Sequence, residues 1–70
     1  MQVKSPLPGI VNRILAEVGS QVSEGDPVLT VEVMKALHTI KFPSGGIVKE
    51  IHVKVGDEIA MGQVVMELQT

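Results

Sequence analysis

An internal repeat is the feature that most limits what this 70-residue chain can fold into. When the sequence is shifted by 37 positions, one half matches the other without a gap, and several of the matches are glycines or prolines. The matched residues are Pro6 and Pro43, Gly9-Ile10-Val11 and Gly46-Ile47-Val48, Ile14 and Ile51, Val18-Gly19 and Val55-Gly56, Gly25 and Gly62, and Val28 and Val65. A short repeated unit cannot bury an apolar face by itself, so the two copies are expected to pack together about a pseudo-two-fold axis.

The composition decides which kind of element is repeated. Val and Ile supply 12 and 6 residues, against 5 Leu and 3 Ala, and branched side chains suit the pleated surface of a sheet. A chain of this length is enough for one small domain, which we place at residues 1–70. Since the chain has no Cys, it can form no disulfide framework and no Cys-based metal site. We therefore expect one all-β domain that is held together by its hydrophobic core.

Charge and hydropathy argue against two classes of partner. The net charge is -2 with acidic and basic residues interspersed, and a single aromatic residue offers no stacking surface for bases. No apolar run approaches the roughly 20 residues that cross a bilayer. The N-terminus also lacks the charged and apolar regions of a signal peptide. We expect no nucleic acid partner and no direct insertion into a membrane.

Each copy of the repeat contains a strand that begins after a glycine and in which apolar residues recur at every second position. The residues expected to share one face are Ile10, Ile14 and Val18 in the first copy and Ile51, Val53 and Val55 in the second. Polar Asn12 and Lys49 interrupt the strands at equivalent positions. A β-bulge or a strand exit near each polar residue would account for both interruptions.

Further strands are expected around the centre and at the end of the chain. The segment Val28–Val33 should lead into a turn, after which Leu37–Phe42 runs back with Phe42 in the core. The segment Val64–Leu68 is expected to pair with Gln2–Ser5 and so to hold both termini. In the segment Val28–Val33, the inward residues are expected to be Leu29, Val31 and Val33. About eight short strands in two symmetric layers predict a flattened barrel or sandwich, with the central hairpin at one end and the termini at the other.

The turn between the two central strands contains no residue that favours a tight turn. Its central pair is expected to be Met34-Lys35, whereas tight two-residue hairpins select Gly, Asn or Asp because their backbone needs positive φ. An ordinary L-residue in that geometry costs about 1–2 kcal/mol. If the turn has this form, something other than turn formation selected an apolar residue beside an exposed lysine, and we interpret Lys35 as the functional residue. The alternative at this point is an ordinary solvated lysine in a looser turn.

Other chemically reactive side chains lack the partners that a catalytic or metal site requires. His38 and His52 have no Cys or carboxylate at ligand spacing in the sequence, so we expect both on strand surfaces and expect no metal site. The serines show no triad context, and the glycine clusters precede no helix that could bind phosphate. No catalytic residue is predicted.

Several motifs in a fixed order give the chain a resemblance to a known family. They are Pro6-Leu7-Pro8-Gly9, Val18-Gly19 with Gly25-Asp26, Glu32-Val33-Met34-Lys35, Pro43-Ser44-Gly45-Gly46, and Val55-Gly56-Asp57 with Gly62. With these motifs the chain resembles the biotinyl carrier domain of biotin-dependent carboxylases and decarboxylases, within the wider biotinyl/lipoyl superfamily. The resemblance covers essentially the whole chain. It implies the barrel-sandwich hybrid fold, a flattened β-barrel of two four-stranded antiparallel sheets.

The residues around Lys35 discriminate between two cofactors within that superfamily. The usual biotinyl signature is Ala-Met-Lys-Met, whereas lipoyl domains typically carry Asp-Lys-Ala. Met34 before the lysine favours biotin, while Ala36 replaces the second Met and matches the lipoyl pattern. The resemblance implies biotin bound covalently to Lys35. The neighbouring residues implied in recognition are Glu32, Val33, Met34 and Ala36.

The same resemblance implies what the chain does and which proteins it meets. A carrier of this kind is modified by a biotin protein ligase and moves carboxyl groups between a biotin carboxylase and a carboxyltransferase, while catalysing neither step. The compartment would be the cytoplasm, or an organelle matrix if the parent carboxylase is eukaryotic. Two alternatives stay open, namely a lipoyl acyl-carrier domain and an unmodified interaction module that uses the same hairpin.

Overall fold

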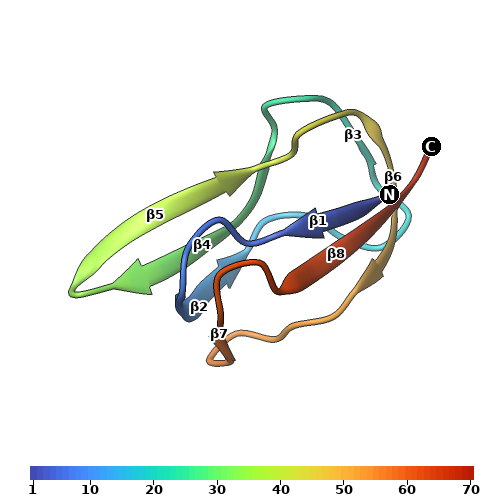
Figure 1. The fold of residues 1–70 in the computed structure, drawn as a ribbon. Helices are drawn as coiled ribbons and strands as arrows, with labels where there is room; N and C mark the ends of the chain where they lie inside the picture. Colours follow the sequence, from blue (N-terminus) through green and yellow to red (C-terminus); the bar gives the residue numbers. More distant parts are fainter.

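Eight β-strands and no helix make up the chain in a computed structural model that describes residues 1–70. The strands are β1 (Gln2–Lys4), β2 (Gly9–Ile14), β3 (Gln21–Val22), β4 (Pro27–Val33), β5 (Ala36–Lys41), β6 (Gly46–Ile51), β7 (Glu58–Ile59) and β8 (Val64–Gln69). They form two four-stranded antiparallel sheets, with strand orders β1-β8-β6-β3 and β5-β4-β2-β7 (Figure 1). The predicted all-β class is confirmed. No helix is present that is long and apolar enough to cross a membrane.

The repeat seen in the sequence is the symmetry that relates these two sheets. A shift of 37 residues carries β2 onto β6, β3 onto β7 and β4 onto β8, so the strand order of one sheet becomes that of the other. Each sheet contains strands from both copies, because β1 and β3 pair with β8 and β6, while β5 and β7 pair with β4 and β2. The two copies therefore interlock, and the predicted barrel-sandwich hybrid with pseudo-two-fold symmetry is confirmed.

Irregular pairing lies where the two polar interruptions predicted it. The register of β2 against β4 shifts between Val11 and Arg13, which leaves Asn12 without a partner. The register of β6 against β8 shifts in the same way between Val48 and Glu50. A bulge of this kind inserts one residue and changes the face on which the following side chains lie.

The predicted inner face of these strands is wrong at Ile10, and the bulge is the cause. Because one extra residue lies between Val11 and Ile14, these two side chains point inward together, and Ile10 points outward. Val11 and its repeat partner Val48 are each 1 % exposed, whereas Ile10 is 45 % exposed. The inner face of each strand is therefore one residue out of phase with a simple alternation.

The expectation for Val18 and Val55 is also wrong. The strands β2 and β6 end at Ile14 and Ile51, so both valines lie beyond the strands in turns. Their side chains are 62 % and 63 % exposed. Val53, which belongs to the same predicted face, is buried in the core although it lies outside a strand.

The core lies between the two sheets and draws on both copies of the repeat. Phe42 is its largest fully buried side chain, as predicted, and Leu29 and Val31 of β4 are buried with it. Val33 is half-buried and packs against the core. The buried apolar residues are Val3, Val11, Val22, Val28, Leu29, Val31, Ile40, Phe42, Val48, Val53, Ile59, Val65, Met66 and Leu68.

The two ends of the molecule have different roles. Strand β1 pairs with β8, as predicted, and the amino group of Met1 donates a hydrogen bond to the Leu68 carbonyl oxygen at 2.7 Å. Both termini therefore lie at one end, while the β4–β5 hairpin extends from the other (Figure 1). The Cα atoms span 33 × 19 × 18 Å, so the hairpin tip is far from both termini along the long axis.

Candidate functional site

The hairpin joining β4 and β5 closes through a two-residue turn made of Met34 and Lys35. Val33 and Ala36 are the last paired residues on either side of it. Met34 has φ of 50° and Lys35 has φ of 67°, and they are the only non-glycine residues with positive φ. The predicted centre of the turn is confirmed, and its backbone has the left-handed form of a tight hairpin.

The Lys35 side chain lies free at the tip of the hairpin. Lys35 is exposed, and it belongs to neither of the ion pairs in the molecule. Met34 beside it is 95 % exposed, the highest value among the large apolar residues outside the core. A primary amine on a flexible stem, without a partner, is chemically suited to acylation by another enzyme.

The hairpin is fixed at its base by close packing of β2 against β4. The strands pair through Ile10 with Glu32 and Val11 with Val31. Gly9 precedes this pairing, and a Cβ at Gly9 would lie 2.7 Å from the carbonyl oxygen of Glu32. Only glycine therefore allows β2 to approach β4 this closely without displacing the backbone that leads into the turn.

The five residues predicted around the site lie together in this one hairpin. Val33 and Ala36 face each other directly below the turn, and Glu32 is opposite Leu37 one step further from the tip. Glu32 and Ala36 are exposed, as are Met34 and Lys35, while Val33 is half-buried.

An exposed apolar pair beside Glu32 was missed in the sequence. Ile10, Glu32 and Leu37 occupy one row across β2, β4 and β5, because Glu32 pairs with Ile10 on one side and with Leu37 on the other. Ile10 is 45 % exposed and Leu37 is 59 % exposed. One signal for this row was present in the sequence. Leu37 and Ile40 are three positions apart on one strand, so their side chains lie on opposite faces of the sheet, and Ile40 is the buried one. The register of the strands is needed to place Leu37 beside Glu32 and Ile10.

Replacing Met34 by Asn is expected to stabilise the chain. Asn tolerates the left-handed backbone better than Met, and Met34 has little buried surface to lose. The expected gain is about 0.5–1 kcal/mol in the free energy of unfolding, measured by urea denaturation. Met61→Asn is the matched control, because Met61 is 71 % exposed in another turn but does not have positive φ. An equal gain in both variants would contradict the strain assigned to Met34.

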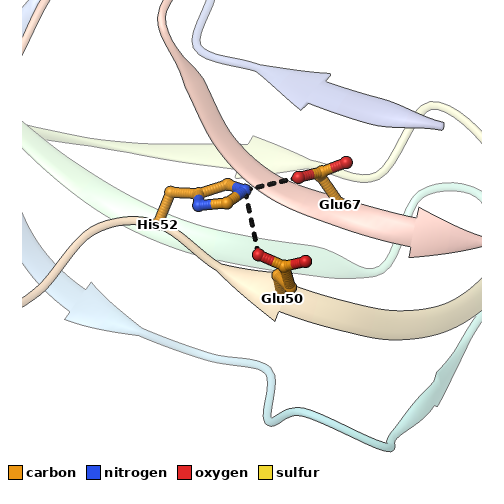
Figure 2. Close-up of side chains that lie close together, drawn as sticks. All are labelled: Glu50, His52 and Glu67. Carbon is orange, nitrogen blue, oxygen red and sulfur yellow. Dashed lines mark hydrogen bonds and ion pairs between the residues drawn. The ribbon is translucent and has the colours of Figure 1, made fainter.

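A second cluster of polar side chains lies in the other sheet and corrects the view that His52 has no partners. His52 Nε2 lies 2.6 Å from Glu67 Oε2 and 3.8 Å from Glu50 Oε2 (Figure 2). The hydrogen bond from His52 holds the pKa of the Glu67 carboxyl below its usual value. His38, by contrast, is exposed on β5 opposite Val31, as expected of a strand-surface residue.

Comparison with known protein families identifies the chain. The model of the family described as "Biotin-requiring enzyme" matches residues 1–68. The chain belongs to this family. The match includes both copies of the repeat and the Lys35 hairpin, so the resemblance based on motifs is confirmed over nearly the whole sequence.

Two curated relatives of the chain are named as parts of carboxylases, and the name of one of them includes biotin. The chain is 43 % identical over 37 residues to the mitochondrial methylcrotonoyl-CoA carboxylase subunit alpha of Dictyostelium discoideum. It is 41 % identical over 39 residues to the biotin carboxyl carrier protein of acetyl-CoA carboxylase of Solanum lycopersicum. These matches cover 53 % and 56 % of this chain, but only 5 % of the first relative and 56 % of the second.

Solved structures share the fold over the whole chain. The urea carboxylase of Kluyveromyces lactis superposes on 99 % of this chain and 6 % of its own, with a TM-score of 0.91 and 29 % identity. The lipoyl domain of the 2-oxoglutarate dehydrogenase complex from Azotobacter vinelandii covers 100 % of this chain and 96 % of its own, with a TM-score of 0.79 and 20 % identity. The second likeness concerns the fold alone.

Proposed function

We propose that this chain is a biotin carboxyl carrier domain in which biotin is attached to Nζ of Lys35. The observation that carries the proposal is the position of Lys35, which is exposed and unpaired at the tip of a hairpin whose base is fixed by the sheets. Membership of the family described as "Biotin-requiring enzyme" and the name of the biotin carboxyl carrier relative from Solanum lycopersicum support biotin as the group.

The residues of the tip fit a covalently attached group of this kind. Both turn residues are exposed, and the exposed Ala36 methyl adds little bulk beside the lysine. Acylation of Nζ removes its positive charge, and no ion pair of the folded chain is lost because Lys35 has none. Attachment should therefore leave the fold unchanged.

The attachment reaction requires an external enzyme. The neutral Lys35 amine attacks the carbonyl carbon of an activated biotinyl-adenylate, an amide bond forms, and AMP leaves while the amine loses a proton. The chain offers no general base beside Nζ, since Glu32 lies further down β4 and pairs across to Leu37. We assign deprotonation and activation to a biotin protein ligase, with Met34 as an adaptable apolar contact for that enzyme.

The role after attachment is transport rather than catalysis. Biotin supplies the atom that accepts and gives up a carboxyl group when it is bound. The chain contributes a rigid base, a flexible lysine stem and a tether that raises the local concentration of the group near its partners. We propose a biotin carboxylase and a carboxyltransferase as those partners, within a larger enzyme in the cytoplasm or an organelle matrix.

Intact mass spectrometry after modification tests the proposal. The chain is incubated with ATP and either biotin and a biotin ligase or lipoate and a lipoate ligase. We expect one biotinyl increment in the first reaction and no increment in the second. Met34→Asn should slow biotinylation while keeping the fold. Lipoylation without biotinylation would overturn biotin as the group, and an unchanged biotinylation rate in Met34→Asn would overturn the assigned role of Met34.

A further inference from the structure

A cluster of three potential metal ligands lies at the end of β6 and on the neighbouring strand β8. His52 Nε2 lies 2.6 Å from Glu67 Oε2 and 3.8 Å from Glu50 Oε2. All three ligand atoms lie within 4.8 Å of one another. Figure 2 shows the imidazole reaching between the two carboxylates, which come from separate strands. The cluster belongs to the sheet that does not contain the Lys35 hairpin.

The pairing of the strands places two like charges directly opposite each other. Glu50 of β6 is the register partner of Glu67 of β8. Opposed like charges destabilise a strand pair unless a cation lies between them. Lys49 and the N-terminal amine contribute positive potential at Glu67, yet neither forms an ion pair with it. The two carboxylates are therefore arranged to accept a cation, with an imidazole nitrogen beside them.

The repeat supplies an internal comparison for this cluster. The positions equivalent to Glu50, His52 and Glu67 in the first copy are Arg13, Leu15 and Thr30. Arg13 pairs with Thr30 in the same way that Glu50 pairs with Glu67. The fold itself therefore does not require these ligand residues, since the first copy builds the same strand pair without them.

We propose that Glu50, His52 and Glu67 bind one Zn²⁺ ion, with water completing the coordination. Tetrahedral bonds of about 2 Å place neighbouring ligand atoms about 3.3 Å apart. The distances of 2.6 Å and 3.8 Å from Nε2 lie on either side of that value, so small rotations of the exposed side chains are sufficient. An imidazole ligand favours Zn²⁺, Ni²⁺ or Cu²⁺ over Mg²⁺, which prefers oxygen ligands.

The ion replaces a proton in this arrangement. When Nε2 donates its proton to Glu67, its lone pair is not free for a metal. Binding of Zn²⁺ uses the Nε2 lone pair of a neutral imidazole, so the ring hydrogen of His52 lies on Nδ1 in the bound form. The bound ion joins the end of β6 to β8, the strand that pairs with β1 at the termini. Zn²⁺ should therefore raise the melting temperature of the chain.

Isothermal titration of the 70-residue chain with ZnCl₂ tests the site. We expect one ion per chain, a rise in melting temperature with ZnCl₂ and no rise with MgCl₂. His52→Leu and Glu67→Thr introduce the residues that the first copy already accommodates, and each should weaken Zn²⁺ binding by about tenfold or more. His38→Gln is the matched control and should bind Zn²⁺ like the unmodified chain.

Imidazole NMR signals of the unmodified chain give a second readout that needs no variant. The signals of His52 should shift on addition of ZnCl₂ while those of His38 remain in place. Equal affinity in the unmodified chain and His52→Leu would overturn the site, as would a shift confined to His38 or no binding at all. Each of these results leaves the proposed modification of Lys35 untouched, because the two sites lie in different sheets.

Discussion

Lys35→Arg is expected to abolish biotin incorporation while the fold remains intact. Arginine keeps the positive charge and much of the length of lysine, but its guanidinium does not form the amide that a ligase makes with a primary amine. The Lys35 side chain is exposed and has no ion pair to lose. The change in the free energy of unfolding should stay within about 0.5 kcal/mol. Intact mass after ligase treatment and a urea titration measure the two quantities.

Lys41→Arg is the matched control for this variant. Lys41 is an exposed lysine on β5, at the opposite end of the strand from the turn. We expect this variant to be biotinylated to the same extent as the unmodified chain. A biotinyl increment in Lys35→Arg would mean that another amine is modified, and it would contradict the role assigned to the hairpin tip.

Phe42→Ala is expected to have the largest effect on stability. Phe42 is the largest fully buried side chain and is 1 % exposed. Removing a buried Phe side chain costs about 3–5 kcal/mol. A 70-residue domain is stable by roughly 4–10 kcal/mol in total, so much of the stability would be lost. Urea denaturation should show a greatly reduced midpoint, and biotinylation should fall because the hairpin loses its fixed base.

Phe42→Leu tests whether the loss of stability in Phe42→Ala comes from the cavity that the smaller side chain leaves or from any change at this position. Leu fills part of the same volume and should cost clearly less than Ala. The first copy holds the small polar residue Ser5 at the equivalent position, and Ser5 is also buried. One large and one small buried residue therefore occupy equivalent positions in the two copies. Equal stability of Phe42→Ala and the unmodified chain would contradict the central packing role of Phe42.

Much of the fold could be predicted because the repeat contains its own landmarks. Glycines and prolines at matching positions marked the turns, and the 37-residue shift implied two equivalent layers. The pairing of β1 with β8 and the inward positions of Leu29 and Val31 followed from strand alternation. The interlocking of the copies through β3 and β7 did not follow, because a two-residue strand carries almost no periodic signal.

The errors lie where alternation is broken. Asn12 indicated a bulge correctly. The extra residue reverses the alternation, so the residue that shares the inner face with Ile14 is Val11 rather than Ile10. The sequence pattern alone does not show which residues before the bulge point inward. Val18 and Val55 were misplaced for a related reason, since their apolar character suggested a strand that in fact ends before them.

The two sites differed in how visible they were in the sequence. Lys35 and its neighbours are contiguous, so local turn chemistry was sufficient to single them out. His52 and Glu67 are 15 positions apart and meet only through the register of β6 against β8. Glu50 is only two positions before His52 in the sequence, so it was Glu67 that could not be found without the folded structure.

Fragmentation of the biotinylated chain after proteolysis tests the attachment of biotin most directly. The unmodified chain is treated with biotin ligase, ATP and biotin, digested, and each lysine-containing peptide is sequenced by tandem mass spectrometry. We predict biotin on Lys35 alone, with Lys4, Lys41, Lys49 and Lys54 unmodified. Biotin on any of those four lysines in place of Lys35 would contradict the assignment of the hairpin tip as the attachment site.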